Sequence, residues 1–115
     1  MKLPNLENAY VPEEKITLYL LNNQHPKGRG KAQFFIQFGF SMAQWKQLAD
    51  ALIDHAQSHD VVKTEQTQFG IRYVIEGELE TPVKRKPKVR VVWFISTDHT
   101  EPHLVTAYPL EGSDD

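Results

Sequence analysis

Cysteine is absent from the chain, and its absence removes several classes of function at once. Without thiols there is no disulfide framework, no thiolate nucleophile and no cysteine-based zinc site. A reducing cytoplasm suits such a chain, so we expect a cytoplasmic protein, although secretion as part of something larger also fits.

Long apolar runs are absent as well. No stretch of the sequence approaches the roughly 20 apolar residues that a membrane-spanning helix needs. The first residues, from Met1 to Asn5, also lack the apolar run of a secretory signal. We therefore expect a soluble chain without contact to a membrane.

Length and charge bound what remains. At 115 residues the chain has the usual size of one domain, so we expect a single domain over residues 1–115. The formal net charge of −2 hides a separation of charge, because residues 27–31 and 84–90 hold eight of the 13 basic side chains and none of the 15 acidic ones. A solvated hairpin tip is the simplest interpretation of residues 84–88. A basic face that binds a partner is the alternative.

Helical signals dominate the first 60 residues. Pro12 and the two glutamates after it predict a helix that runs to about Leu21. Turn-forming residues then predict a loop over 22–30. A second helix is expected from Lys31, with Gly39 placed to end it in the left-handed conformation.

A third helix has the clearest start signal. Ser41 and Gln44 form a capping-box pattern, and Phe40 and Trp45 are spaced as a hydrophobic staple. An apolar stripe at helical spacing follows and predicts core rather than a cofactor site: Trp45, Leu48, Ala49 and Leu52. Polar residues close this helix: His55, Ser58 and His59.

After Asp60 the apolar period changes from helical to two, which predicts strands. The third strand is apolar on both faces and should therefore be central. The fold class is α+β, with the N-terminal helices packed on one face of a four-stranded antiparallel β-sheet. We expect the tail over 111–115 to be frayed. The predicted strands are Val61–Gln68, Ile71–Glu80, Val89–Ile95 and His103–Pro109, with a tight turn at Phe69-Gly70.

The loop from His25 to Lys31 is the first candidate for chemistry. It places an acid/base candidate and three cations on a glycine-containing turn before a helix, which suits phosphate. A nucleotide-binding P-loop is excluded, because no strand precedes the loop and no hydroxyl residue follows its lysine. An ordinary solvated turn explains the same residues somewhat more simply.

Histidine pairs and the polar residues of the last two strands are the other candidates for chemistry. Histidines occur in the pairs His55/His59 and His99/His103, but further zinc ligands are not clearly supplied, so we expect surface histidines and no metal site. The last two strands carry polar and aromatic residues that could stack bases and hold phosphates: Arg90, Trp93, His103, Thr106 and Tyr108. For Trp93 a core position is favoured, given its place in the apolar alternation.

An ordered series of short motifs resembles an uncharacterised bacterial domain family. That family is similar to the C-terminal toxin domains of contact-dependent growth-inhibition proteins, which are ribonucleases of the barnase, EndoU, colicin and RelE type. The resemblance spans nearly the whole chain. The motifs are Leu3-Pro4-Asn5, Glu7-Asn8-Ala9, Tyr19-Leu20-Leu21-Asn22, His25-Pro26, Gly28-Arg29-Gly30-Lys31-Ala32, Phe35, Val89-Arg90-Val91-Val92-Trp93-Phe94 and Pro102-His103-Leu104-Val105-Thr106-Ala107-Tyr108.

The resemblance implies a metal-independent, cofactor-free endoribonuclease that cleaves structured RNA such as transfer RNA, with a cognate inhibitor protein as a second partner. In this chemistry a base assists attack by the ribose 2'-hydroxyl, an acid protonates the leaving oxygen, and cations stabilise the developing charge. The resemblance makes His25, Lys31 and Thr106 the catalytic residues. Together with the loop and the polar row on the last strands, it leads us to expect substrate contacts from Lys27, Arg29, Arg90 and Tyr108. A non-catalytic module of the same fold that binds nucleic acid or protein is the alternative, and a structural unit is a third interpretation.

Overall fold

A computed structural model describes residues 1–27 and 29–110, so the predicted fraying of 111–115 lies outside the described residues. Helical segments come first and a sheet follows, which confirms the predicted α+β class. The helical elements are η1 (Leu6–Asn8), α1 (Glu13–Lys15), η2 (Ile16–Leu20), α2 (Arg29–Gln37) and α3 (Trp45–Ser58). The strands are β1 (Val61–Thr67), β2 (Gly70–Glu78), β3 (Lys88–Ser96) and β4 (His103–Pro109). Within residues 1–27 and 29–110, no helix is long and apolar enough to cross a membrane.

The sheet is an antiparallel meander with the order β1-β2-β3-β4. β3 lies between β2 and β4, and both Val91 and Val92 are fully buried, which confirms the predicted central strand. The pairing of β3 with β4 shifts by one residue, because Val92 lies opposite Thr106 while Trp93 lies opposite Leu104. This bulge leaves Val105 as the extra residue on β4, and such bulges often re-aim side chains beside functional sites.

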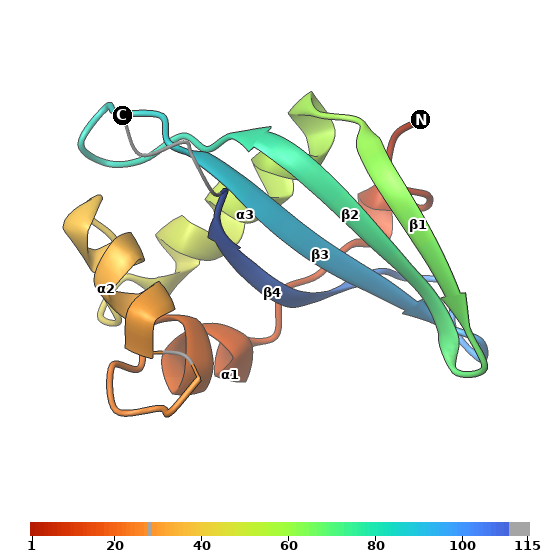
Figure 1. Cartoon of the computed structure of the whole chain (residues 1–115), viewed down its shortest axis with the longest axis horizontal. Coiled ribbons are helices and arrows are strands. Elements are labelled where there is room, and N and C mark those ends of the chain that lie inside the picture. The colour runs from red at the N-terminus through yellow and green to blue at the C-terminus, as the bar shows by residue number, and fades with distance from the viewer. Residues whose placement is uncertain (28, 111–115) are drawn as a thin grey trace.

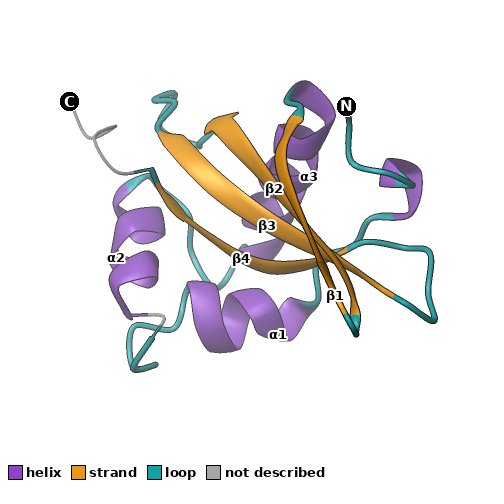
Figure 2. Cartoon of the chain, turned by 45° about the vertical axis from the view of Figure 1, so that its right-hand side comes forward, coloured by secondary structure: helices purple, strands orange, loops and turns teal. Residues whose placement is uncertain are grey.

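The helices lie in two places around the sheet. Figures 1 and 2 show α3 behind the sheet and α1 and α2 along the side formed by β4. Apolar side chains from both groups and from the sheet form one core, with Trp93, Phe35 and Leu52 among the fully buried ones. The predicted core position of Trp93 is therefore confirmed.

Two of the three predicted helices start elsewhere than expected. α2 begins at Arg29, two residues early, and Gly39 ends it with a φ of 97°, as predicted. α3 begins only at Trp45, so the predicted start at Ser41 is wrong. The Ser41 hydroxyl does accept a hydrogen bond from the Gln44 amide at 3.3 Å, but the Ser41 carbonyl accepts from the same amide and closes a separate turn.

The first predicted helix is continuous but not regular. α1 passes directly into η2, which has π-helical geometry, and the Leu21 amide donates to the Ile16 carbonyl five residues back at 2.7 Å. Both Ile16 and Leu20 are fully buried in this segment. Single π-helical turns are frequent at functional sites. This turn carries Tyr19, which lies at the centre of the site described below.

Candidate functional site

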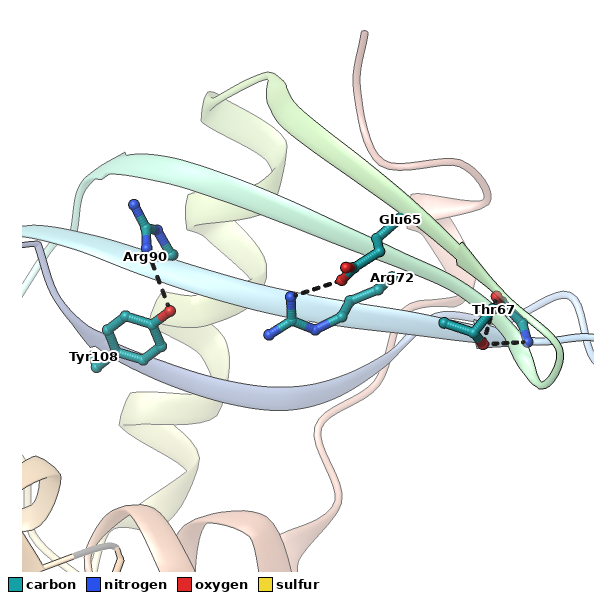
Figure 3. Close-up of polar contacts among 6 residues, drawn as sticks. Glu65, Thr67, Arg72, Arg90 and Tyr108 are labelled. Atoms are coloured by element: carbon teal, nitrogen blue, oxygen red, sulfur yellow. Dashed lines mark hydrogen bonds and ion pairs between the residues drawn. The ribbon is translucent and has the colours of Figure 1, made fainter.

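The candidate site lies where the outward face of the sheet meets η2 and α2. On this face Arg90 of β3 pairs with Tyr108 of β4, and Val92 pairs with Thr106. Figure 3 shows Arg90 and Tyr108 on the side of the sheet turned away from α3. The two strands therefore present an arginine, a phenol and a threonine hydroxyl beside the helices along β4.

Tyr19 joins the helical side of the site to the sheet. Its hydroxyl lies 3.1 Å from the Thr106 hydroxyl, and this hydrogen bond links residues 87 positions apart. Its ring meets the His25 ring edge to face, with 5.1 Å between the centroids. The sequence interpretation gave Tyr19 no role, and the only signal was its place in one of the short motifs.

Lys31 lies between the two tyrosines of the site. Its ammonium is 5.5 Å from the centroid of the Tyr19 ring and 5.8 Å from that of Tyr108, distances typical of cation–π contacts. The same ammonium donates a hydrogen bond to the Lys27 carbonyl at 3.1 Å. The first turn of α2 thus holds a positive charge over the polar end of β4.

Two positive groups act on Tyr19 in addition to its hydrogen bond. Lys15 approaches the ring at 5.5 Å, the same distance as Lys31. Burial raises the pKa of Tyr19, but the hydrogen bonds from Thr106 and Lys31 and the charges of Lys31 and Lys15 outweigh burial and lower the pKa below its ordinary value. The surroundings of this phenol therefore favour its ionised form more than water does.

Arg90 is held by two partners. Its guanidinium donates to the Tyr108 hydroxyl at 3.5 Å and to the Glu76 carboxylate at 2.7 Å. The Tyr108 contact first and the Glu76 contact next raise the pKa of Arg90, so it stays charged. Glu76 was not predicted as part of the site. Its charge offsets part of that of Arg90, so Lys31 is the less compensated of the two cations.

The His25 loop folds around its own histidine. The Lys27 amide donates to Nδ1 of His25 at 2.9 Å, and the Arg29 amide donates to the His25 carbonyl at 2.9 Å. Because Nδ1 accepts a hydrogen bond, the proton of the neutral ring is on Nε2. The side chains of Lys27 and Arg29 are exposed, and no described contact ties them to Thr106 or Tyr108.

An open groove of about 570 Å³ lies beside the Tyr19–Thr106 hydrogen bond. Pockets of roughly 300–1,000 Å³ are typical for small ligands. Leu18 stands in its wall with 61 % of its surface exposed, although it is a large apolar residue. The lining residues are Pro12, Glu14, Lys15, Leu18, Tyr19, His25, Val105 and Thr106.

The expectation of surface histidines is wrong for His55. Its side chain is only 2 % exposed, and its Nε2 atom lies 3.2 Å from the Gly77 carbonyl. Burial is the main cause that lowers the pKa of His55 to about 4, against the opposing effect of that hydrogen bond. The neighbouring His59 bonds to the His55 carbonyl at 2.9 Å. In the described ranges, no group of three or more His, Cys, Asp or Glu residues is placed to hold a metal ion.

Trp93 does not belong to the outward row of side chains on the last two strands, in agreement with its predicted core position. Trp93 is fully buried on the inner face, opposite in direction to Arg90 and Tyr108. His103 does lie on the outward side, with Tyr10 at 6.0 Å and Phe94 at 5.9 Å between ring centroids. Burial, then the charges of Lys15 and His99, lower the pKa of His103.

Comparison with known proteins gives a family and a fold. Residues 2–111 match a family model described as "Domain of unknown function (DUF6883)". The structure is similar to a chain of a contact-dependent growth inhibition toxin–immunity protein complex from Klebsiella pneumoniae 342. The TM-score is 0.71 at 16 % identity, over 93 % of this chain and 97 % of that chain. No curated protein matches the sequence. These matches confirm the resemblance drawn from the motifs, and at this identity the structural match shows the fold alone.

Proposed function

Because the chain belongs to the DUF6883 family, which is defined without a function, we propose one from its site: a toxin-like, metal-independent endoribonuclease of the cytoplasm that cleaves structured RNA such as transfer RNA. One observation carries the proposal. Lys31 lies between the rings of Tyr19 and Tyr108, beside the hydrogen-bonded hydroxyls of Tyr19 and Thr106 and next to an open groove. Convergent polar groups at the edge of a groove are the usual mark of a binding or active site.

The positive groups of the site fit a phosphodiester. Lys31 would stabilise the charge that develops on the phosphate in the transition state, since a preorganised cation in a partly dry site acts strongly there. Arg90, bound to Tyr108, would hold a phosphate oxygen from the sheet side. Exposed Lys27 and Arg29 would add positive charge at the approach to the site.

Acid/base chemistry would complete the reaction. The ribose 2'-oxygen attacks the adjacent phosphorus, the bond to the 5'-oxygen breaks, and a 2',3'-cyclic phosphate forms, so DNA is not a substrate. His25 is the proposed acid/base, and Thr106 would orient the reacting groups. For His25 to accept a proton at Nδ1, the hydrogen bond from the Lys27 amide must open.

The experiment is cleavage of total RNA and of purified transfer RNA in the presence of a chelator. We expect the wild-type protein to cut RNA, and His25→Ala and Lys31→Ala to lose roughly 100-fold or more of the rate. Lys46→Ala is the matched control, because Lys46 is exposed on α3, away from the site. Unchanged cleavage by both site variants would remove the site assignment, and an inert wild-type protein would remove the ribonuclease function.

A second candidate is a non-catalytic module that binds RNA or an inhibitor protein through the basic loop between β2 and β3. The observation in its favour is the exposed run formed by Lys84, Arg85 and Lys86 between β2 and β3. The structurally similar chain comes from a toxin–immunity complex, which supports a search for a protein partner. This candidate predicts salt-dependent binding without any turnover of RNA, and binding that ignores salt would count against it.

A further inference from the structure

Tyr19 connects the helical side of the site to the sheet. Its hydroxyl meets Thr106 at 3.1 Å, its ring meets His25 at 5.1 Å, and the ammonium groups of Lys15 and Lys31 lie at 5.5 Å each. Tyr19 also lines the groove beside β4. Its hydroxyl is therefore positioned by Thr106 of the sheet, and two positive charges lie near its ring.

His25 by itself accounts for only part of the proton transfer. Cleavage needs one group to remove the 2'-hydroxyl proton and another to protonate the departing 5'-oxygen. The Nδ1 atom of His25 accepts a hydrogen bond from the Lys27 amide in the folded loop, so this atom is already engaged. A second proton donor within reach of the groove is required.

We infer that Tyr19 is a further catalytic residue, which donates its hydroxyl proton to the leaving 5'-oxygen of the RNA. The inference rests on the proposed ribonuclease function. As the bond between phosphorus and the 5'-oxygen breaks, the phenolic O–H bond breaks too, and its proton completes the new 5'-hydroxyl. The product is a Tyr19 phenolate, which then takes a proton from water.

The surroundings of Tyr19 stabilise that phenolate. Thr106 can donate its hydroxyl hydrogen to the phenolate oxygen, and Lys15 and Lys31 supply two positive charges near it. Glu14 is the acidic group that shares the groove, and His25 is the remaining titratable neighbour. The lowered pKa of Tyr19 agrees with this balance of charges. A phenol with a lowered pKa gives up its proton more readily than an ordinary tyrosine does.

The first test is Tyr19→Phe, which keeps the ring and its contacts with Lys31 and His25 but removes the hydroxyl. General acids contribute about 10²–10⁴-fold, so we expect kcat to fall by roughly 100-fold or more while KM changes little. Tyr10→Phe is the matched control, because Tyr10 is exposed and packs on His103 instead. We expect its kcat to equal that of the wild-type protein.

The second test uses RNA whose leaving 5'-oxygen is replaced by sulfur. A thiolate leaves without a proton, so Tyr19→Phe should cleave this substrate nearly as fast as the wild-type protein does, whereas Lys31→Ala should stay slow. Persistence of the full Tyr19→Phe defect on the sulfur substrate would show that Tyr19 is structural and would overturn the inference.

A third variant covers the case in which Tyr19→Phe does not fold. Fluorotyrosine at position 19 keeps the shape and lowers the phenol pKa, so the basic limb of the kcat–pH profile should move to lower pH. An unmoved limb would overturn the inference. If the wild-type protein cleaves RNA and Tyr19→Phe is equally active, this inference alone is wrong. If the wild-type protein does not cleave RNA, the proposed function is wrong as well.

Discussion

His55 presents its imidazole to the core, although histidine is usually found at least partly exposed. In the described part of the chain its Nδ1 atom has no hydrogen-bond partner, so a proton there would be buried without compensation. The sequence contains a signal for this position, because His55 follows Leu48 by seven residues and Leu52 by three. It therefore extends the apolar stripe of α3.

We predict that acid destabilises the fold through His55. The pKa of His55 is about 4 in the folded protein against about 6.5 when unfolded, so stability is complete above pH 6.5. As the pH falls from 6.5 to 4, only the unfolded chain binds this proton, and the free energy of unfolding should drop by up to about 3 kcal/mol. Urea denaturation at pH 7 and pH 4.5 measures the loss.

His55→Gln isolates this effect. The variant keeps an amide donor for the Gly77 carbonyl but cannot titrate, so its stability should depend less on pH than that of the wild-type protein. His99→Gln is the control, since His99 is exposed in the turn before β4 and its removal should leave the slope unchanged. Equal pH dependence in the wild type and His55→Gln would contradict the assignment.

The site residues illustrate what sequence spacing does not reveal. His25 and Lys31 are near each other in the chain, and the Lys27 amide and carbonyl link them. Thr106 lies more than 70 positions further on, and only a folded sheet decides which strand faces the loop. Periodicity places Thr106 on a strand, but it does not say which helix residue that strand meets. The motif resemblance grouped the two segments, while the part played by Tyr19 needed the structure.

At the scale of elements, the strands were predicted better than the helix starts. Alternating apolar residues identify the inward face of a strand directly, and β4 has the predicted bounds of His103–Pro109. The start of α3 was misplaced because a local turn closed by Ser41 competes with the first helical turn. The π-helical geometry of η2 has no sequence signal of its own, because its residues also fit an α-helix.

The β1–β2 hairpin depends on a glycine at the start of β2. Gly70 has a φ of 153°, and a Cβ atom added there would lie 2.2 Å from the Ile95 carbonyl oxygen. The Thr67 hydroxyl accepts hydrogen bonds from the amides of Phe69 and Gly70 at 3.0 and 3.2 Å. Figure 3 shows Thr67 at this hairpin, with dashed lines from its hydroxyl. The predicted turn at Phe69-Gly70 is thus shifted, since Gly70 already belongs to the strand.

We predict opposite outcomes for two identical glycine substitutions. Gly70→Ala forces β2 away from Ile95 and should cost about 3 kcal/mol, through steric overlap and an unfavourable φ. In Gly30→Ala the new methyl group on α2 meets none of the described residues within 4 Å, so the variant should be more stable by about 0.5–1 kcal/mol, through helix propensity. Urea denaturation at pH 7 measures both changes. A stable Gly70→Ala protein would contradict this prediction, because it would show that β2 can shift to accommodate the added methyl group.

At the scale of the whole molecule, charge is distributed unevenly. The basic loop between β2 and β3 connects Glu78 to Lys88, which lie opposite each other in the hairpin. Lys88 precedes Arg90 of the Arg90–Tyr108 pair by two residues. Arg85 of the loop stacks on Phe38 at 5.4 Å, and Lys86 pairs with Glu80 at 3.2 Å. A net charge of −2 therefore coexists with a basic region next to the candidate site.

We predict that this loop contributes to RNA binding through phosphate contacts. The slope of the logarithm of the RNA association constant against the logarithm of the salt concentration is negative. Changing Lys84, Arg85 and Lys86 together to glutamine should make this slope shallower by about 2, since each contact to single-stranded RNA contributes about 0.7. Stability should change little, because exposed ion pairs are worth at most about 1 kcal/mol. Filter binding to a non-cleavable RNA from low to high salt measures the slope.

Lys63→Gln is the matched control for charge, because Lys63 is exposed on β1, which β2 separates from β3. It should leave the slope near that of the wild type. An unchanged slope in the triple variant would place the RNA elsewhere on the molecule.

The hydrogen bond between Tyr19 and Thr106 has a consequence for folding. Each strand pairs with its neighbour in the chain, so the sheet can grow from local hairpins, which form quickly. The bond from η2 to β4 instead closes a loop of 87 residues, and such closures come late because their entropy cost is high. Partly folded chains would therefore contain most of the secondary structure but no site. Recovery of activity after dilution from urea would then time the last step of folding, and should lag behind the recovery of the sheet signal in circular dichroism.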